Sequence, residues 1–237
     1  MKQVYSVLMF CFIALHAFAQ KVLVNDPNAE IRSVSGTFHG IKIGGGMQLF
    51  LSQHESNSVA VSATDPEARD HIVTEIKNGI LHISYDGGRN WNSGSKKLKV
   101  YVSFSSLESL EASGASNIQV AGTIKVPSFS IEVSGASDFK GAVDVDKLKL
   151  ELSGASDIKI QGTAREARIQ SSGASDIRAY DLAIDKCTAH ASGASDIQIT
   201  VNKELAAQAS GASDINWKGD GVITEINTSG ASSVKKR

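Results

Sequence analysis

The second half of the chain alternates between apolar and polar residues with a period of two, on both sides of a recurring four-residue motif. Before the motif that starts at Ser134, Phe129, Ile131 and Val133 are apolar, while Glu132 between them is polar. After the motif, one position is apolar in every copy. Its occupants are Ile118, Phe139, Ile158, Ile177, Ile197, Ile215 and Val234. Because alternate side chains of a strand point to opposite faces, the pattern predicts a strand on each side of every motif.

The motif itself is Ser-Gly-Ala-Ser, and five of its seven copies continue into Asp. The copies begin at Ser113, Ser134, Ser153, Ser172, Ser192, Ser210 and Ser229. A spacing of about twenty residues is typical of a solenoid, in which each coil buries its apolar face against the next. We therefore predict an all-β fold in which residues 106–237 form a right-handed parallel β-helix of about seven coils. Each coil should contain two short strands, the motif as a corner, and a variable return.

Residues 20–105 lack the motif but still alternate in short stretches typical of strands. These stretches are 41–43, 47–51, 59–61, 80–83 and 98–102. Asp65 followed by Pro66 predicts the start of one short helix, and the glycine-rich segment 86–95 predicts a hairpin loop. The three glycines at 44–46 indicate a turn or a bulge. We expect this region to form a β-rich cap or sheet layer that leads into the solenoid.

The first nineteen residues have the features of a signal peptide. Lys2 supplies a positive charge, residues 7–14 are apolar, and Ala17-Phe18-Ala19 fits the small-x-small cleavage rule, which predicts a mature start at Gln20. A membrane anchor is the alternative, but the apolar run is too short to span a bilayer. The sequence thus predicts an exported protein, located in the periplasm, on the cell surface or outside the cell, and not a membrane-spanning one.

Composition and charge narrow the function further. The chain of 237 residues is 41% hydrophobic and has a formal net charge of −1, so no global field favours nucleic acid or an anionic membrane. After removal of the signal peptide Cys187 is the one remaining cysteine, which excludes an internal disulfide. Cys187 falls in an inward column, where we expect a small buried core residue. His190 falls in an outward column and is expected at the surface.

The position directly after the motif forms an acidic column. It is occupied by Asn117, Asp138, Asp157, Asp176, Asp196, Asp214 and Ser233. Stacked carboxylates repel one another unless they face donors or cations. One reading is a row of oxygen ligands for Ca²⁺ or a similar hard cation. The other reading, favoured because each coil carries a single Asp, is that the side chains stabilise turns by accepting local N–H bonds.

No pattern indicates a catalytic residue or a cofactor. The repeated serines lack the Gly-x-Ser-x-Gly context of a nucleophile elbow, and four histidines in the first half show no metal-ligand spacing. Lys140, Lys159 and Arg178 form a basic stripe, either a solvated strand face or a site for an acidic glycan. Trp91 lies in the predicted loop, where either ligand contact or packing against the sheet is consistent with the sequence.

Three segments together resemble a known family. They are 41–49 (Ile-Lys-Ile-Gly-Gly-Gly-Met-Gln-Leu), 79–83 (Gly-Ile-Leu-His-Ile) and 107–116 (Leu-Glu-Ser-Leu-Glu-Ala-Ser-Gly-Ala-Ser). With the serial motif copies, the chain is similar to the family described as "putative auto-transporter adhesin, head GIN domain", found widely in Bacteroidetes. The resemblance covers nearly the whole mature chain. It implies a β-solenoid-like exported protein and supplies no catalytic or binding residues to carry over.

Together these observations favour a non-enzymatic exported binding or scaffolding protein, adhesin-like, whose repetitive surface meets a glycan, a protein partner of the envelope, or another copy of itself. The alternative is a polysaccharide lyase or hydrolase, because carbohydrate-active enzymes also use parallel β-helices with clustered carboxylates. Catalytic carboxylates form local and irregular clusters, whereas those of this chain are periodic. Binding of a glycan with or without product formation would separate the two readings.

Overall fold

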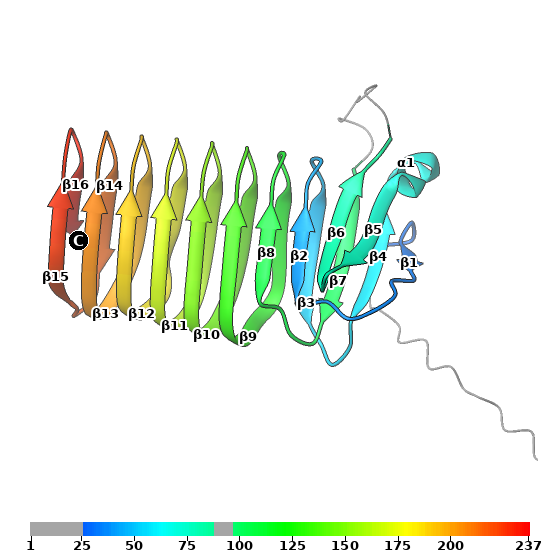
Figure 1. The fold of residues 1–237 in the computed structure, drawn as a ribbon, viewed down its shortest axis with the longest axis horizontal. Coiled ribbons are helices and arrows are strands. Elements are labelled where there is room, and N and C mark those ends of the chain that lie inside the picture. Colours follow the sequence, from blue (N-terminus) through cyan, green and yellow to red (C-terminus); the bar gives the residue numbers. More distant parts are fainter. Residues whose placement is uncertain (1–25, 88–96) are drawn as a thin grey trace, which may run out of the picture.

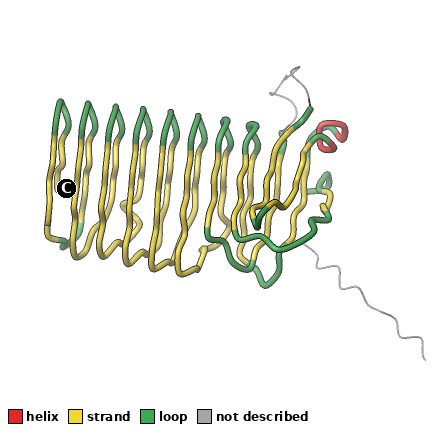
Figure 2. Tube along the Cα trace, viewed as in Figure 1, coloured by secondary structure: helices red, strands yellow, loops and turns green. Residues whose placement is uncertain are grey.

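The motif repeats stack into a β-solenoid with two opposed sheet faces, as the sequence predicts (Figure 1). The computed structural model describes residues 26–87 and 97–237. Five long strands make up most of the stack. They are β9 (Asn117–Val133), β10 (Asp138–Leu152), β11 (Asp157–Ser171), β12 (Asp176–Ala191) and β13 (Asp196–Ala209). Each begins right after one motif and ends just before the next, so the tight loops at one edge of the stack are the motif corners (Figure 2).

Neighbouring coils pair in parallel and in register. Between β10 and β11 the pairing runs from Asp138 opposite Asp157 to Leu152 opposite Ser171. The return, expected to be a variable segment between two short strands, instead stays within the ladder. The reason is that the alternation continues through it, since Val143 and Val145 are buried while Asp144 between them is exposed. Each coil is therefore one bent strand closed by one corner.

The last coil consists of three shorter strands. They are β14 (Asp214–Lys218), β15 (Val222–Thr228) and β16 (Ser233–Lys236). The strand β14 continues one sheet beside the first half of β13, and β15 continues the other beside its second half. The strand β16 then pairs with β14. The parallel stacking thus continues up to Lys236, with one shift of register between β13 and β15 at Leu205 and Ala206.

The stack extends beyond the first motif into the N-terminal half. The strands β2 (Gly40–Ile43) and β3 (Gln48–Gln53) pair in parallel with β8 (Ser109–Ala112) and β9. The glycines at 44–46 form the turn between them and lie under the first motif corner. The backbone N–H of Ser113 donates to the carbonyl of Ile43 (2.9 Å) and that of Asn117 to Met47 (2.9 Å). The solenoid geometry therefore begins at residue 40.

The N-terminal strands stack in an order that differs from the sequence. The strands β6 (Ile80–Tyr85) and β7 (Lys99–Phe104) lie in parallel outside β2 and β3. The strands β6 and β7 belong to opposite sheets and do not pair with each other, so the prediction that they form a hairpin was wrong. Most of the segment 86–95, with Trp91, lies outside the described residues, as does the predicted signal peptide.

Antiparallel strands close this end of the stack. The strand β5 (Ile72–Lys77) pairs with β6, β4 (Ser58–Ser62) with β7, and β1 (Glu30–Arg32) with β4. The short helix α1 (Pro66–Asp70) begins as predicted, with the Asp65 side chain accepting a bond from the Glu67 backbone N–H (3.1 Å). The N-terminal region is thus β-rich and caps the solenoid.

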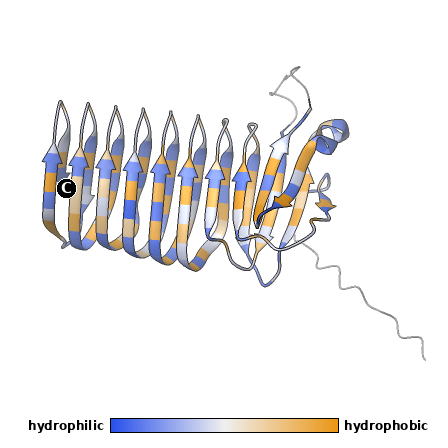
Figure 3. Cartoon of the chain, in the orientation of Figure 1, coloured by the Kyte–Doolittle hydropathy of each residue, from blue (hydrophilic) through white to orange (hydrophobic). Residues whose placement is uncertain are grey.

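The core is a continuous apolar column between the two sheets. Along each coil the hydrophobic residues alternate with hydrophilic ones, which gives the orange and blue bands of Figure 3. The inward position after the motif is buried in six coils, where it is Ile118, Phe139, Ile158, Ile177, Ile197 and Ile215. Cys187 is buried in the opposite sheet, as expected. Within the described parts of the chain no helix has the length and apolar character to cross a membrane.

A candidate ligand-binding groove on the solenoid

The motif corner is a structural device rather than an exposed site. Its fourth residue is a buried serine in each of the first six copies, for example Ser156 and Ser175, both fully buried. The Ser156 hydroxyl donates to the carbonyl of Ser153 (3.0 Å), and that of Ser175 donates to the carbonyl of Ser172 (2.8 Å). The corner is therefore closed by this serine, and the prediction that the following Asp accepts local N–H bonds was wrong.

Three carboxylates of the Asp column accept hydrogen bonds from side chains on the same outer face. Asp176 accepts a bond from Arg178 (3.1 Å), and Asp196 accepts one from Asn216 (3.2 Å). The hydroxyl of Ser233 donates to Asp214. Across residues 26–87 and 97–237, no three His, Cys, Asp or Glu side chains come together in a way that could hold a metal ion.

The basic stripe predicted on that face lies beside the Asp column. Arg178 is held between Asp176 (3.1 Å) and Asp157 (3.9 Å), so its charge is compensated. Lys140 and Lys159 occupy the preceding coils of the same column, directly opposite each other across the β10–β11 ladder. Five carboxylates flank three cations, so this face offers little attraction for an anion.

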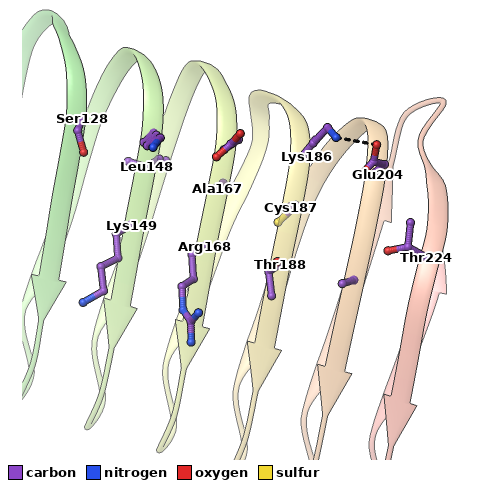
Figure 4. Close-up of a pocket in the computed structure, with 13 residues that line it drawn as sticks. Ser128, Leu148, Lys149, Ala167, Arg168, Lys186, Cys187, Thr188, Glu204 and Thr224 are labelled. Carbon is purple, nitrogen blue, oxygen red and sulfur yellow. Dashed lines mark ion pairs between the residues drawn. The ribbon is translucent and has the colours of Figure 1, made fainter.

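A groove of about 460 Å³ lies on the opposite sheet, over the start of the strand segments that lead into each motif (Figure 4). It is lined by Ser128, Lys147, Leu148, Lys149, Glu166, Ala167, Arg168, Lys186, Cys187, Thr188, Glu204, Ala206 and Thr224. The in-register stacking of the coils explains why a hollow forms at this place. One outward column runs from Lys149 through Arg168 and Thr188 to Ala206, so its side chains shorten along the stack. The floor is made of inward residues such as Ala167 and Cys187.

The second outward column of the groove alternates in charge. Lys147, Glu166, Lys186 and Glu204 follow one another across four neighbouring coils. Lys186 forms an ion pair with Glu204 (2.8 Å), drawn in Figure 4, and this hydrogen bond raises the pKa of Lys186. This pair forms one wall of the groove and keeps both of its charges occupied.

Two cations at the other end of the groove have no such partner. Lys149 pairs with Glu151 (2.8 Å), but neither Lys147 nor Arg168 makes an ion pair or a side-chain hydrogen bond within the part of the chain that the structure describes. In Figure 4 the side chains of Lys149 and Arg168 project from adjacent strands along the same face. The groove thus combines four cationic with two anionic side chains, and two of the cations are available to a ligand.

Burial removes Cys187 from any reactive role in this groove. The thiol lies among the apolar residues of the core, and burial raises its pKa to about 12. Only the thiolate is strongly nucleophilic, so the thiol is inert at neutral pH. His190 is half-buried in the outward column two residues closer to the motif, beside Gln170 and Gln208. Shallow depressions that include His190 continue the groove towards the corners.

The groove residues were not singled out from the sequence. Lys149 and Arg168 occupy the outward position four residues before a motif, and Lys147 the position six before it. The alternation of apolar and polar residues predicts that these three side chains face the solvent. Aligning the coils at these two positions would also have shown that Lys149 and Arg168 are neighbouring cations. Which of the charged side chains form ion pairs depends on side-chain geometry between coils. The alternation of apolar and polar residues does not predict that geometry.

Comparisons with known proteins agree on the fold. The family model described as "Putative auto-transporter adhesin, head GIN domain" matches residues 37–221. A crystal structure of "a putative adhesin" from Bacteroides fragilis has a TM-score of 0.77 at 20% identity, covering 88% of this chain and 96% of that one. A "putative lipid binding protein" from Parabacteroides distasonis has a TM-score of 0.68 at 22% identity, covering 90% and 98%.

A third structure, "a putative adhesin" from Parabacteroides merdae, has a TM-score of 0.68 at 18% identity and covers 90% of this chain and 97% of that one. No curated protein matches the sequence. At these identities the likeness to the solved structures establishes a shared β-solenoid fold, while ligands and residue roles have to be argued from this chain itself.

Proposed function

The chain belongs to the family described as "putative auto-transporter adhesin, head GIN domain", and from this membership we propose that it is an exported, non-enzymatic binding protein with an adhesin-like role. Its ligand lies in the groove that includes Lys147 and Arg168. The features of a signal peptide in residues 1–19 support export to the periplasm or the cell surface. The partner is a glycan or a protein of the cell envelope.

The observation that carries this proposal is a preformed hollow whose polar side chains are held on a rigid frame. Thr188 and Arg168 project from adjacent strands whose backbone is fixed by the parallel ladder. Binding sites built on strands lose little conformational entropy when a ligand arrives, because their backbone is already ordered. The buried core beneath the groove makes it a surface site with no enclosed chamber.

The hydrolase alternative needs two carboxyl groups that differ in protonation and face one bond of the substrate. The lyase alternative is distinguished by the assay for product release described below. Glu204, one of the two carboxylates in the groove, is engaged by Lys186 (2.8 Å). This ion pair occupies the Glu204 carboxylate on the wall of the groove, so it is not free to face a substrate bond. The binding role therefore accounts better for the charges in the groove.

A substitution that fills the hollow tests the proposal. Ala206 points outward and is half-buried in the groove, so Ala206→Phe should block it without entering the core. The mature chain is applied to an array of bacterial glycans and to isolated envelope fractions, and product release is assayed on every glycan bound. We expect binding by the wild type, loss of most of that binding in Ala206→Phe, and no product.

Ala121→Phe is the matched control. Ala121 is exposed on the opposite sheet, where it pairs with Ser52, so the same change in size occurs far from the groove. This variant should bind as well as the wild type, with an unchanged melting temperature. Equal binding by all three proteins would refute the groove as the site, and detectable cleavage would refute the non-enzymatic role.

A further inference from the structure

We propose that the groove recognises an acidic glycan, a polysaccharide bearing carboxylate or sulfate groups, through the guanidinium of Arg168 and the ammonium of Lys147. The inference rests on the proposed binding function and names the class of its ligand. Arginine is suited to the role because its planar fork of N–H donors matches a carboxylate or a sulfate in a bidentate way.

The position of Arg168 is unfavourable unless an anion compensates it. Arg168 lies directly opposite Lys149 in the β10–β11 ladder, and strands of a sheet are about 4.8 Å apart. Like charges directly opposite each other destabilise a sheet. The adjacent outward column of the groove avoids that cost, since Lys147, Glu166, Lys186 and Glu204 alternate in sign. Nearer the motif corners, Glu132 and Glu151 also face each other. The pair of cations at Lys149 and Arg168 departs from this rule inside the groove.

Lys147 adds a second unpaired cation at the same end. It projects from β10 two residues before Lys149, on the same outward face. The remaining lining is rich in hydroxyl groups, from Ser128, Thr188 and Thr224. Hydroxyls can both donate and accept hydrogen bonds, which suits the hydroxyl groups of a sugar. Ser128 lies opposite Lys147 at the cationic end, whereas Thr188 and Thr224 lie farther along the groove. This mixture of cations and hydroxyls corresponds to a sugar chain that carries occasional acidic groups.

The same lining argues against other anionic partners. Nucleic acids present a charge at every nucleotide and are bound by uniformly basic surfaces, whereas Glu166 and Glu204 lie within this groove. A membrane surface is bound by basic residues together with exposed apolar or aromatic side chains, and the outward lining here is polar or small. A peptide bound in a groove needs pockets for apolar anchors. A glycan needs none of these features.

The test removes two cations from the groove and, separately, two cations from the opposite face. The groove variant is Lys147→Gln with Arg168→Gln. The matched control is Lys140→Gln with Lys159→Gln, which makes the same change in net charge on the other sheet. Both sites are exposed, so both variants should fold like the wild type, which their melting temperatures verify.

Binding is measured by affinity electrophoresis in gels containing heparin, oligogalacturonate, neutral dextran or poly-glutamate. We expect the wild type to bind at least one of the two acidic glycans, and the groove variant to bind it at least tenfold more weakly. The control should bind like the wild type. Binding should weaken with salt in proportion to a small number of ionic contacts.

Several outcomes would overturn the inference. Equal weakening of the groove variant and the control would show that net charge alone is responsible. Unchanged binding by the groove variant would remove Arg168 and Lys147 from the site. Equal or tighter binding of poly-glutamate would make the partner an acidic peptide. Binding of dextran or of other neutral glycans alone, abolished by Ala206→Phe, would refute the acidic class while leaving the proposed binding function intact.

Discussion

Each residue of the motif has its own physical role in the corner. Gly154 adopts φ +79°, and a Cβ at this position would lie 2.5 Å from the carbonyl oxygen of Gly135 in the preceding coil. Only glycine permits both this backbone conformation and this close approach. The next residue, Ala155, donates its backbone N–H to that same carbonyl (2.8 Å). The corner is thus hydrogen-bonded from coil to coil, and its fourth residue closes it from within.

The buried hydroxyl at the fourth position should therefore contribute to stability. In Ser156→Ala the carbonyl of Ser153 loses its hydroxyl donor, and loss of a buried hydrogen bond costs about 1 to 2 kcal/mol. We expect a decrease of this size in the free energy of unfolding, measured by urea denaturation. Ser153→Ala is the matched control, because Ser153 lies in the same corner with an exposed side chain. A similar loss in both variants would contradict the assigned role.

The buried thiol of Cys187 should make stability depend on alkaline pH. Burial raises the pKa of Cys187 from an ordinary value of 9.0 to about 12, so between these values the unfolded chain loses a proton that the folded chain keeps. Its contribution is thus complete below pH 9 and decreases as the pH rises towards 12. The loss is about 1.4 kcal/mol per pH unit above pH 9.

Cys187→Ala provides the reference, since Ala167 and Leu205 show that the column accepts other residues. The variant should be less stable at pH 8, and its deficit relative to the wild type should narrow by about 1.4 kcal/mol at pH 10. Groups that titrate in both proteins cancel in this difference. Urea denaturation at the two pH values measures it, and a constant deficit would show that the thiol ionises in the folded protein.

At the scale of the strands, charged residues form a second, more regular pattern that runs from coil to coil. Where each strand bends, Asp146, Arg165, Asp185 and Lys203 form one alternating column. Arg165 pairs with Asp146 (2.7 Å) and Lys203 with Asp185 (2.8 Å). The neighbouring column alternates in the opposite sense, from Lys147 to Glu204. Opposite charges thus meet both along a strand and across strands, an arrangement that favours one register over a slip of one coil.

Reversing one charge in this column should show how much the alternating charges contribute to stability. Arg165 lies between Asp146 and Asp185, and the hydrogen bond that its guanidinium donates to Asp146 raises the pKa of Arg165. Arg165→Glu would place three carboxylates in a row and should lower the melting temperature at low salt. Adding Asp146→Lys should recover part of the loss, and 1 M salt should reduce the difference. A melting temperature insensitive to salt in the single variant would indicate that steric changes dominate.

The sequence predicted the repeating elements well because their period is short and their core positions are strict. The N-terminal coil was harder. Its corner at 44–46 consists of three glycines, and Met47 is buried where the later coils have serine, so the motif is absent although Ile43 and Leu49 keep the inward pattern. The stacking order of β6, β2 and β8 is set by pairing between distant segments. Periodicity along the chain contains no information about such pairing.

The binding groove could not be predicted from the sequence for a different reason. The alternation assigns Lys149 and Arg168 to the outside, but a hollow forms only because Thr188 and Ala206 follow them in the same column. Whether a lysine pairs with the acid beside it depends on rotamers across two or three coils. Lys149 reaches Glu151 (2.8 Å) while Arg168 reaches no acid within the described residues, a difference that composition and spacing do not encode.

At the scale of the whole molecule, two repeats of different length coexist. The backbone and the core repeat every coil, whereas the charges at the bends repeat every second coil. Stability of a solenoid is approximately a sum of coil and neighbour contributions, so a coil can be removed if its neighbours still fit each other. Because the core repeats in every coil, core packing alone predicts that deletion of one coil is tolerated as well as deletion of two. The charge pattern predicts that the two deletions differ.

Deletion of residues 153–171 removes one coil and joins Leu152 to Ser172, which keeps every inward column in phase. It also places Lys147 opposite Lys186 and Asp146 opposite Asp185. Deletion of 153–191 removes two coils and leaves Lys147 facing Glu204. We expect both proteins to keep the β-rich circular dichroism spectrum, with lower melting temperatures than the full chain because apolar contacts are lost.

The two deletions should respond differently to salt. At 1 M ionic strength the Debye length is about 3 Å, so repulsion between exposed like charges that lie farther apart than this is largely screened. The melting temperature of the one-coil deletion should therefore rise with salt relative to the full chain, whereas that of the two-coil deletion should follow it. Reversing Lys147 and Asp146 within the one-coil deletion restores alternation and should remove the extra salt dependence. An identical salt response in both deletions would mean that the charge pattern does not determine how coils fit together, and that the shared core and corners are sufficient.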